Sequence, residues 1–310
     1  MKFSLCFSSF ALASGLASAS PNIIYFTEMP AVSSYTAYDF VAGSASCGSR
    51  YYAAAVQAFI SWGLMITEDG ETNVVTHEDF PDDTNDKLVQ NLWCDSTDPS
   101  GQTLTAVMSD TENPTYSVFK IHINDDLTVT TDLIADIPKS SSELSSGFST
   151  EFQATPSGQE VYASWVVNDR SGKTIDGSLK RVDVKTGEVT EWELKGDNGY
   201  IYSLFAKTDS ATSVSAVLGK NGLYQSTTLT LNDDGTIAVG DLIEDRTLFK
   251  GGMPWQIDEE GGVGVAIGNK QPQVVEFMDV DSFEVLKSLG EEDIFGDVKN
   301  RKLGTVAMGR

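Results

Sequence analysis

The sequence predicts an all-β protein, a six-bladed β-propeller of four-stranded antiparallel blades whose ring is closed by the N-terminal strand. Two repeating patterns predict this fold: outer hairpins and, upstream of each, a short inner strand pair. A single two-stranded hairpin is only marginally stable in water, so hairpins that recur along one chain must share a scaffold. A radial array of small sheets is the scaffold that fits them.

The outer hairpins are clearest at Ser178–Leu194, where two short strands flank the turn Lys185-Thr186-Gly187. Polar and apolar residues alternate along the first strand, which is typical of a strand with one face near water. The five predicted outer hairpins are Trp62–Val75, Ser117–Leu133, Ser178–Leu194, Thr227–Leu242 and Val275–Leu289.

The inner strand pairs carry turn signals with a physical basis. Asp98–Gln102 and Thr155–Gln159 both contain Pro-Ser-Gly, in which proline presets one dihedral and glycine accepts the other. Gly43–Gly48 is predicted to be a turn of small residues. The returning strands are the most apolar, as expected of strands buried on both faces. The predicted pairs are Tyr38–Ala55, Leu92–Met108, Phe152–Val167, Tyr202–Leu218, Trp255–Ile267 and Val298–Met308.

The count of six blades depends on the chain ends. The sequence predicts six inner strand pairs but only five outer hairpins, so the outer part of one blade must come from elsewhere in the chain. Asn22–Glu28 has strand composition, and pairing it beside Leu303–Met308 would close the ring and hide two sheet edges. The alternative is an open five-bladed structure.

Met1–Ser20 is predicted to be a secretory signal peptide rather than part of the fold. Lys2 precedes the short apolar run Phe3–Leu12, and small residues follow around a cleavage point. The alternative is a buried N-terminal strand. No later apolar run is long enough to cross a bilayer. We therefore expect a secreted, extracellular protein with a single propeller domain over residues 21–310.

The cysteines predict one disulfide. Cys6 leaves with the signal peptide, and Cys47 and Cys94 remain at similar places in consecutive repeats. An even number of cysteines in an oxidising compartment favours pairing, and equivalent points on adjacent blades are close in space. The alternative is two separate buried thiols.

The charge balance is strongly acidic, with 45 Asp and Glu against 21 Lys and Arg and a net charge of −24. A field of this sign repels nucleic acid and anionic lipid, so we expect neither a nucleic-acid nor a membrane partner. It would attract divalent or polybasic partners, but a solvated acidic surface is the favoured explanation. We expect a monomer.

No strong catalytic signature is present: the sequence lacks a nucleophile elbow, a P-loop and Cys or His metal spacing. The turns Asn124–Asp126 and Asn232–Gly235 cluster oxygen ligands, but neither follows the calcium-binding loop pattern. Tight hairpin turns use the same residue types.

Residues that enter the inner strands are better candidates, because we expect them near the central channel. Carboxylates and an amide there can hold a hard cation, and aromatic rings can stack on a sugar or apolar ligand. The alternative is that the acids are solvated and the tryptophans fill gaps between blades. The candidate cation ligands are Asp39, Asn91, Glu151 and Asp297, and the candidate stacking residues are Trp93, Trp255, Tyr200 and Tyr202.

The Pro-Ser-Gly-Gln turns and the hairpin Val182–Val189 resemble the repeats of secreted propellers of the YVTN type and the gluconolactonase and senescence-marker group. The resemblance covers most of the mature chain at the level of the repeat. It implies one divalent cation held by Glu, Asn and Asp, for which Asn91, Glu151 and Asp297 are compatible types, although no flanking motif matches.

These observations predict a secreted acidic propeller that acts as a binding or scaffold protein at the channel face. Its partner is an unidentified small molecule, sugar or protein, and no cofactor is expected, with calcium left open. The main alternative is a Ca²⁺-dependent hydrolase or lactonase with its site at the channel. A third possibility is a structural extracellular or cell-wall protein. Fold alone does not decide among them.

Overall fold

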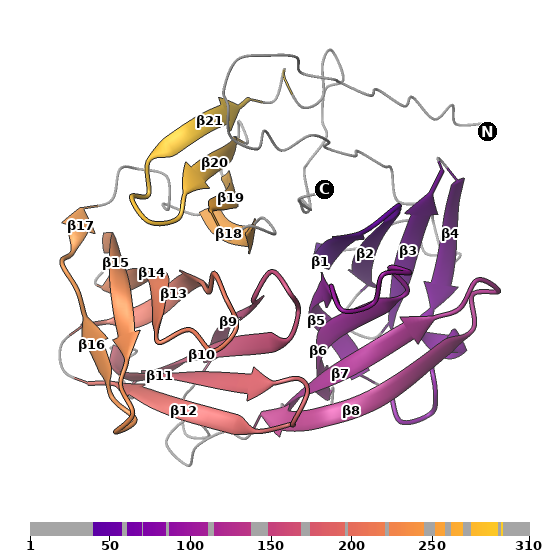
Figure 1. Ribbon diagram of the computed structural model, residues 1–310, viewed down its shortest axis with the longest axis horizontal. Coiled ribbons are helices and arrows are strands. Elements are labelled where there is room, and N and C mark those ends of the chain that lie inside the picture. Colours follow the sequence, from indigo (N-terminus) through magenta and orange to yellow (C-terminus); the bar gives the residue numbers. More distant parts are fainter. Residues whose placement is uncertain are drawn as a thin grey trace.

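The computed structural model consists of small antiparallel sheets arranged side by side around a common axis (Figure 1). It describes residues 40–57, 61–69, 71–84, 87–110, 115–137, 148–168, 174–195, 198–220, 223–244, 252–257, 262–268, 274–290 and 293. Every sheet is built from strands that are consecutive in the chain. The fold is therefore a β-propeller, as the repeating hairpins predicted.

The described chain forms five blades, each with an inner pair and an outer pair of strands. Blade 1 comprises β1 (Phe40–Cys47), β2 (Arg50–Gln57), β3 (Ser61–Glu68) and β4 (Glu71–Thr76). Blade 2 comprises β5 (Lys87–Cys94), β6 (Thr103–Asp110), β7 (Tyr116–Ile123) and β8 (Val129–Ile137). Blade 3 comprises β9 (Phe148–Ala154), β10 (Glu160–Asn168), β11 (Thr174–Asp183) and β12 (Val189–Leu194).

Blades 4 and 5 complete the described fold. Blade 4 comprises β13 (Tyr200–Phe205), β14 (Ser213–Lys220), β15 (Leu223–Leu231) and β16 (Ile237–Val239), and the short β17 (Ile243–Glu244) also pairs with β15. Blade 5 comprises β18 (Gly252–Ile257), β19 (Val263–Gly268), β20 (Val275–Asp279) and β21 (Val285–Leu289). A 3-10 turn, η1 (His77–Asp79), follows blade 1. Among the described residues, no helix is long and apolar enough to cross a membrane.

The predicted sixth blade and its closure by the N-terminal strand are wrong. Each of the five predicted outer hairpins already shares a sheet with its own inner pair, so none of the described blades lacks a strand that Asn22–Glu28 could supply. The sixth inner pair was inferred from Val298–Met308 alone, without an outer hairpin to complete it. Both segments lie outside the described residues.

The first predicted turn is also shorter than expected. Gly43 belongs to β1, and only Gly48 and Ser49 connect β1 to β2. Small residues are needed in β1 because it runs close to β5: a Cβ atom on Gly43 would overlap the Oδ1 atom of Asn91. Glycine within a strand often marks such a close backbone approach.

The hydrophobic core lies in layers between neighbouring blades. Second strands are buried along their length, as Tyr52–Val56 in β2 and Leu104–Met108 in β6 show. One cluster joins blades 1 and 2, another joins blades 2 and 3, and a third joins blades 3 and 4. This confirms the prediction that the apolar returning strands are sandwiched between blades.

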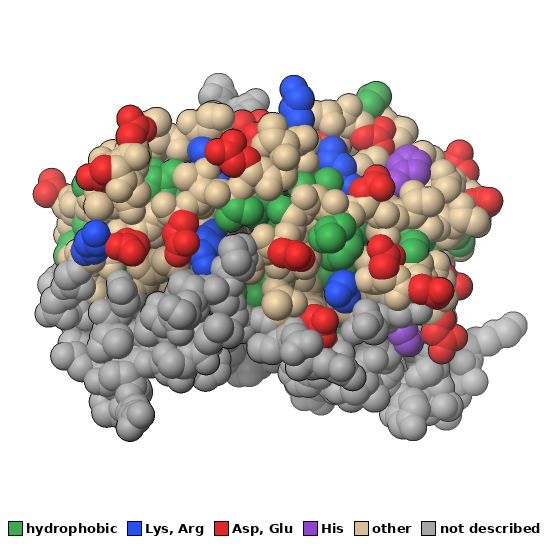
Figure 2. Space-filling view, turned by 90° about the horizontal axis from the view of Figure 1, so that it is seen from below, with side chains coloured by type: hydrophobic (Ala, Val, Ile, Leu, Met, Phe, Trp, Pro, Cys, Tyr) green, Lys and Arg blue, Asp and Glu red, His purple; other side chains and the backbone are tan. Residues whose placement is uncertain are grey.

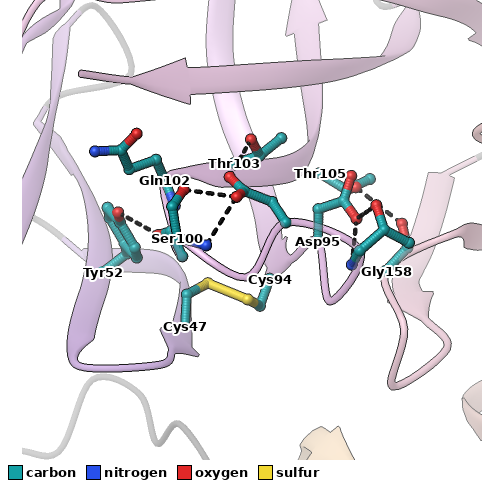
Figure 3. The surroundings of a disulfide bond; sticks show 12 residues. Cys47, Tyr52, Cys94, Asp95, Ser100, Gln102, Thr103, Thr105 and Gly158 are labelled. Atoms are coloured by element: carbon teal, nitrogen blue, oxygen red, sulfur yellow. Dashed lines mark hydrogen bonds between the residues drawn. A yellow bond between two sulfur atoms is a disulfide. The ribbon is translucent and has the colours of Figure 1, made fainter.

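The predicted disulfide is confirmed: Cys47 and Cys94 are bonded, with their Cα atoms 5.3 Å apart (Figure 3). Each cysteine ends the innermost strand of its blade, so the bond joins blade 1 to blade 2. The separation lies in the usual range for a disulfide.

Hydrogen bonds to the turns beside the disulfide join blade 1 to blade 2 and blade 2 to blade 3. The Tyr52 hydroxyl of blade 1 donates to the Gly101 carbonyl of blade 2 at 2.7 Å, and the Thr105 hydroxyl of blade 2 donates to the Gly158 carbonyl of blade 3 at 2.8 Å (Figure 3). Gly101 and Gly158 have φ of +69° and +70°, and a Cβ atom on either would overlap the carbonyl oxygen of Cys47 or Cys94. The two Pro-Ser-Gly turns therefore need glycine for both conformation and space.

Candidate functional site

The innermost strands all carry a β-bulge at the same level. In each strand one residue is skipped in the pairing with its neighbour. Bulges re-aim side chains and are common beside functional sites. The skipped residues are Ala42, Gln90, Thr150, Tyr202 and Trp255, so two predicted stacking residues occupy bulge positions.

The residues that follow the bulges connect blades near the axis. Asn91 of blade 2 donates its amide Nδ2–H to the Phe152 carbonyl of blade 3 at 3.1 Å. Ser203 of blade 4 donates its hydroxyl to Oε1 of Glu151 in blade 3 at 2.9 Å. Two of the predicted cation ligands, Asn91 and Glu151, thus occupy equivalent positions in adjacent blades.

Glu151 is the most unusual polar group of this region. Its residue is only 9% exposed, and the other carboxyl oxygen, Oε2, is buried without a hydrogen-bond partner. Burial raises the pKa of Glu151 well above its usual value, although the hydrogen bond from Ser203 acts in the opposite direction. A buried polar atom without a partner is costly, and a carboxyl with a strongly perturbed pKa near a protein's centre is a candidate functional group.

Three tyrosines gather beside it on blade 4. The rings of Tyr202 and Tyr224 have centroids 4.6 Å apart, and those of Tyr200 and Tyr202 are 6.4 Å apart at an interplanar angle of 64°. All three side chains are half-buried. Burial raises the pKa of Tyr200 and of Tyr202 to about 12, and for Tyr202 the nearby Glu151 adds to the effect.

A glycine positions two of these rings. Gly219 in β14 pairs with Tyr200 on one side and Tyr224 on the other. A Cβ atom on Gly219 would lie 2.6 Å from Cζ of Tyr200, so this ring rests directly over the glycine. The absent side chain leaves room for the Tyr200 ring, and the nearby Tyr224 adds to the raised pKa of Tyr200.

The other predicted stacking residues are placed differently. Trp93 is 7% exposed and belongs to the apolar layer between blades 2 and 3, with Val107 and Phe152 among its neighbours. This is the placement that the gap-filling interpretation expects. The side chain of Trp255 lies outside the described residues, so its role stays a prediction.

The predicted calcium site is only partly visible, because Asp39 and Asp297 lie outside the described residues. The Oδ1 atom of Asn91 accepts a hydrogen bond from the Leu92 backbone N–H at 2.9 Å, which engages the oxygen that a cation would need. Within the described ranges, no group of three His, Cys, Asp or Glu side chains could hold a metal ion. The calcium site as a whole stays a prediction.

The Asp-rich turns use their oxygens internally. Oδ1 of Asp126 accepts from the backbone N–H and hydroxyl of Thr128, and Oδ1 of Asp234 does the same with Thr236. These contacts are what hairpin turns require.

Acidic side chains do not gather at one point on the side of the molecule in Figure 2. Asp and Glu are spread across the described part of this surface, with Lys and Arg between them. Elsewhere among the described residues, carboxylates are also paired with cations, as Asp125 is with Arg50 at 2.6 Å. This arrangement agrees with a solvated acidic surface on this side.

Several site residues were not predicted from the sequence, namely Ser203, Gly219 and Tyr224. Ser203 follows the bulge, and Tyr224 reaches the site only through cross-strand pairing. The signal that could have found Ser203 is the repeated position one residue beyond each bulge, and for Gly219 and Tyr224 it is their pairing across from Tyr200; both require the strand register.

No family model and no curated protein sequence matches this chain. Solved structures that it resembles include the β-propeller domain of Cps50 (Swd1) from Myceliophteria thermophila, with 12% identity over 86% of this chain and 76% of that chain and a TM-score of 0.47. The propeller domain of the Trilobed protease from Pyrococcus furiosus has 10% identity, coverage of 84% and 73%, and a TM-score of 0.43. A putative 6-phosphogluconolactonase from Bacteroides fragilis has 12% identity, coverage of 80% and 70%, and a TM-score of 0.43. These low identities and TM-scores say nothing about the function of the chain. The five described blades themselves show that it is a β-propeller.

Proposed function

We propose that this protein is a secreted binding propeller that receives a small ligand at the tyrosine cluster (Tyr200, Tyr202 and Tyr224) beside Glu151. The observation that carries the proposal is the combination of half-exposed aromatic rings and a buried carboxyl oxygen without a partner. Ligand sites usually combine aromatic surface with a few polar groups that fix orientation.

Two features support secretion. Met1–Ser20 has the pattern of a signal peptide, and the bond between Cys47 and Cys94 is typical of proteins from oxidising compartments. An extracellular location also suits an acidic surface that keeps the protein soluble.

Binding is favoured over calcium-dependent hydrolysis by the geometry of the predicted ligands. Asn91 uses its amide hydrogen to connect blades and its oxygen to accept a backbone hydrogen bond. A residue engaged in this way serves the architecture, and Asn91 and Glu151, the two described members of the predicted set, together have fewer oxygens than the six to eight that Ca²⁺ takes.

A thermal-shift screen of the mature protein tests this function. The probes are glucose, choline, a neutral aromatic alcohol and CaCl₂, each over a range of concentrations. A ligand that binds only the folded state raises the melting temperature in a saturable way. We expect one of the organic probes to do so, and Tyr202→Ala to abolish the shift.

Tyr51→Ala is the matched control, since it removes a tyrosine of blade 1 that packs in a separate cluster with Ala53 and Met65. This variant should melt at a lower temperature yet keep the ligand-induced shift. The proposal is refuted if every shift is unaffected by Tyr202→Ala.

A further inference from the structure

Tyr200 and Tyr202 form an aromatic corner. Their centroids are 6.4 Å apart and their planes meet at 64°, whereas Tyr202 and Tyr224 are in direct ring contact at 4.6 Å. A cation is attracted by a tyrosine face within about 6 Å of the ring centroid, and a single point can satisfy this for both rings of the corner. Two faces inclined to one another are therefore suited to a compact cation.

Glu151 supplies the acidic partner of such a cation: its burial favours the neutral carboxyl in the free protein, and a bound cation favours the ionised form. Ser203, which follows Tyr202 in β13, donates to Oε1 of Glu151 at 2.9 Å, so the carboxyl lies next to the strand that carries the corner. Oε2 remains buried without a partner. An unpaired buried polar atom costs free energy that a charged ligand can recover.

The chemistry distinguishes among ligand classes. A divalent metal needs several oxygens, and no suitable group of three acidic or metal-binding side chains occurs in the described part of the chain. A neutral sugar can stack on one ring and donate a hydroxyl hydrogen bond to a carboxyl, but it has no positive charge for a second inclined face to attract. An ammonium group uses all three, and the net charge of −24 raises the concentration of cations near the surface.

We propose that the ligand of this site carries an alkylated ammonium group, held against the faces of Tyr200 and Tyr202 and paired with Oε2 of Glu151. This inference rests on the proposed function and gives it a substrate class. Glu151 supplies the charge and the tyrosines supply the shape, so each can be tested separately.

The experiment is calorimetric titration of the folded protein with choline and with 3,3-dimethylbutan-1-ol, which has the same shape without the charge. We expect choline to bind saturably and the neutral alcohol to bind at least about tenfold more weakly, since a desolvated cation–π contact alone changes affinity by up to about thirtyfold. Glu151→Gln, which keeps the volume of the side chain, should weaken choline binding by about tenfold or more, because it removes the coulombic attraction to a quaternary nitrogen that has no N–H to donate.

Tyr202→Leu and Tyr202→Phe form the second pair of variants. The leucine variant loses the ring and should lose choline binding, whereas the phenylalanine variant keeps a ring face and should retain binding within about threefold. Circular dichroism of all variants checks that they are folded.

Equal affinity for choline and the neutral alcohol would overturn the ammonium assignment, as would choline binding that survives Glu151→Gln. If the alcohol binds and Tyr202→Leu abolishes that binding, the ammonium inference fails while the proposed site stands. If choline binding is indifferent to both Tyr202→Leu and Glu151→Gln, the site itself is wrong.

Discussion

Removal of the disulfide should lower the free energy of unfolding by about 4 kcal/mol. Cys47 and Cys94 are separated by 47 positions, so the bond closes a loop that contains β2, β3 and β4 of blade 1 and β5 of blade 2. In the chain-entropy description, closing such a loop removes about 14 cal/mol/K from the unfolded ensemble, or about 4 kcal/mol at 25 °C. Because Cys47 is 1% exposed, Cys47→Ala with Cys94→Ala is a better test than serine, which would bury a hydroxyl.

Urea unfolding followed by tryptophan fluorescence measures this loss. The oxidised protein, the protein under a reductant and the double-alanine variant are compared at equal concentration. The reduced protein and the variant should unfold at the same lower midpoint and remain folded in dilute buffer, because the hydrogen bond from Tyr52 to Gly101 still joins the blades. A double variant within about 1 kcal/mol of the oxidised protein would refute the entropic reasoning.

Three further perturbations have definite expected outcomes. Gly158→Ala should lower the free energy of unfolding by more than Gly48→Ala, because both have positive φ but only Gly158 has a carbonyl in the space of the new Cβ; equal losses in urea unfolding would contradict this. Folding raises the pKa of Glu151, so its contribution to stability is complete below the unfolded pKa near 4.5 and is lost as pH rises through the folded pKa. Over that range the free energy of unfolding should fall by up to about 1.4 kcal/mol per pH unit, and Glu151→Gln should remove this dependence. A urea midpoint whose pH dependence is the same in the variant would argue against it. CaCl₂ should shift the melting temperature no more than NaCl at matched ionic strength, and a saturable excess that Glu151→Gln abolishes would restore the calcium site.

The blades could be predicted from the sequence because hairpin formation is local. The turn at Lys185-Thr186-Gly187 and the two Pro-Ser-Gly turns contain the residues that their dihedrals demand, and the strands between them are rich in β-branched and aromatic residues. The number of blades was misjudged because it depends on the ends of the chain. Whether Asn22–Glu28 pairs with another strand is decided by contacts far apart in sequence, which no local pattern encodes.

The candidate site was predictable only in part, for a related reason. Glu151 and Tyr202 were found because inner strands of a propeller must lie near the axis. That Glu151 and Tyr202 lie close together was not predicted, because a bulge shifts the register by one residue and decides which side chains meet. Tyr224 joins the cluster only across Gly219, a contact that the sequence does not reveal.

The polar groups along the innermost strands are hydrogen-bonded to different extents at the disulfide end and near the bulges. At the end that carries the disulfide, polar groups of the connecting turns are paired across the blades: the Asp95 carboxylate accepts from the Gln159 side chain at 2.7 Å, and the Ser96 backbone N–H donates to the Ser157 carbonyl at 2.9 Å. Further along the same strands, the bulges leave Glu151 with an unpaired oxygen. Such an unpaired group costs roughly 1–3 kcal/mol, and a small margin of stability tolerates it only if other contacts hold the blades together. The contacts at the disulfide end therefore allow the fold to tolerate a carboxyl oxygen without a hydrogen-bond partner near the axis, where a cationic ligand can pair with it.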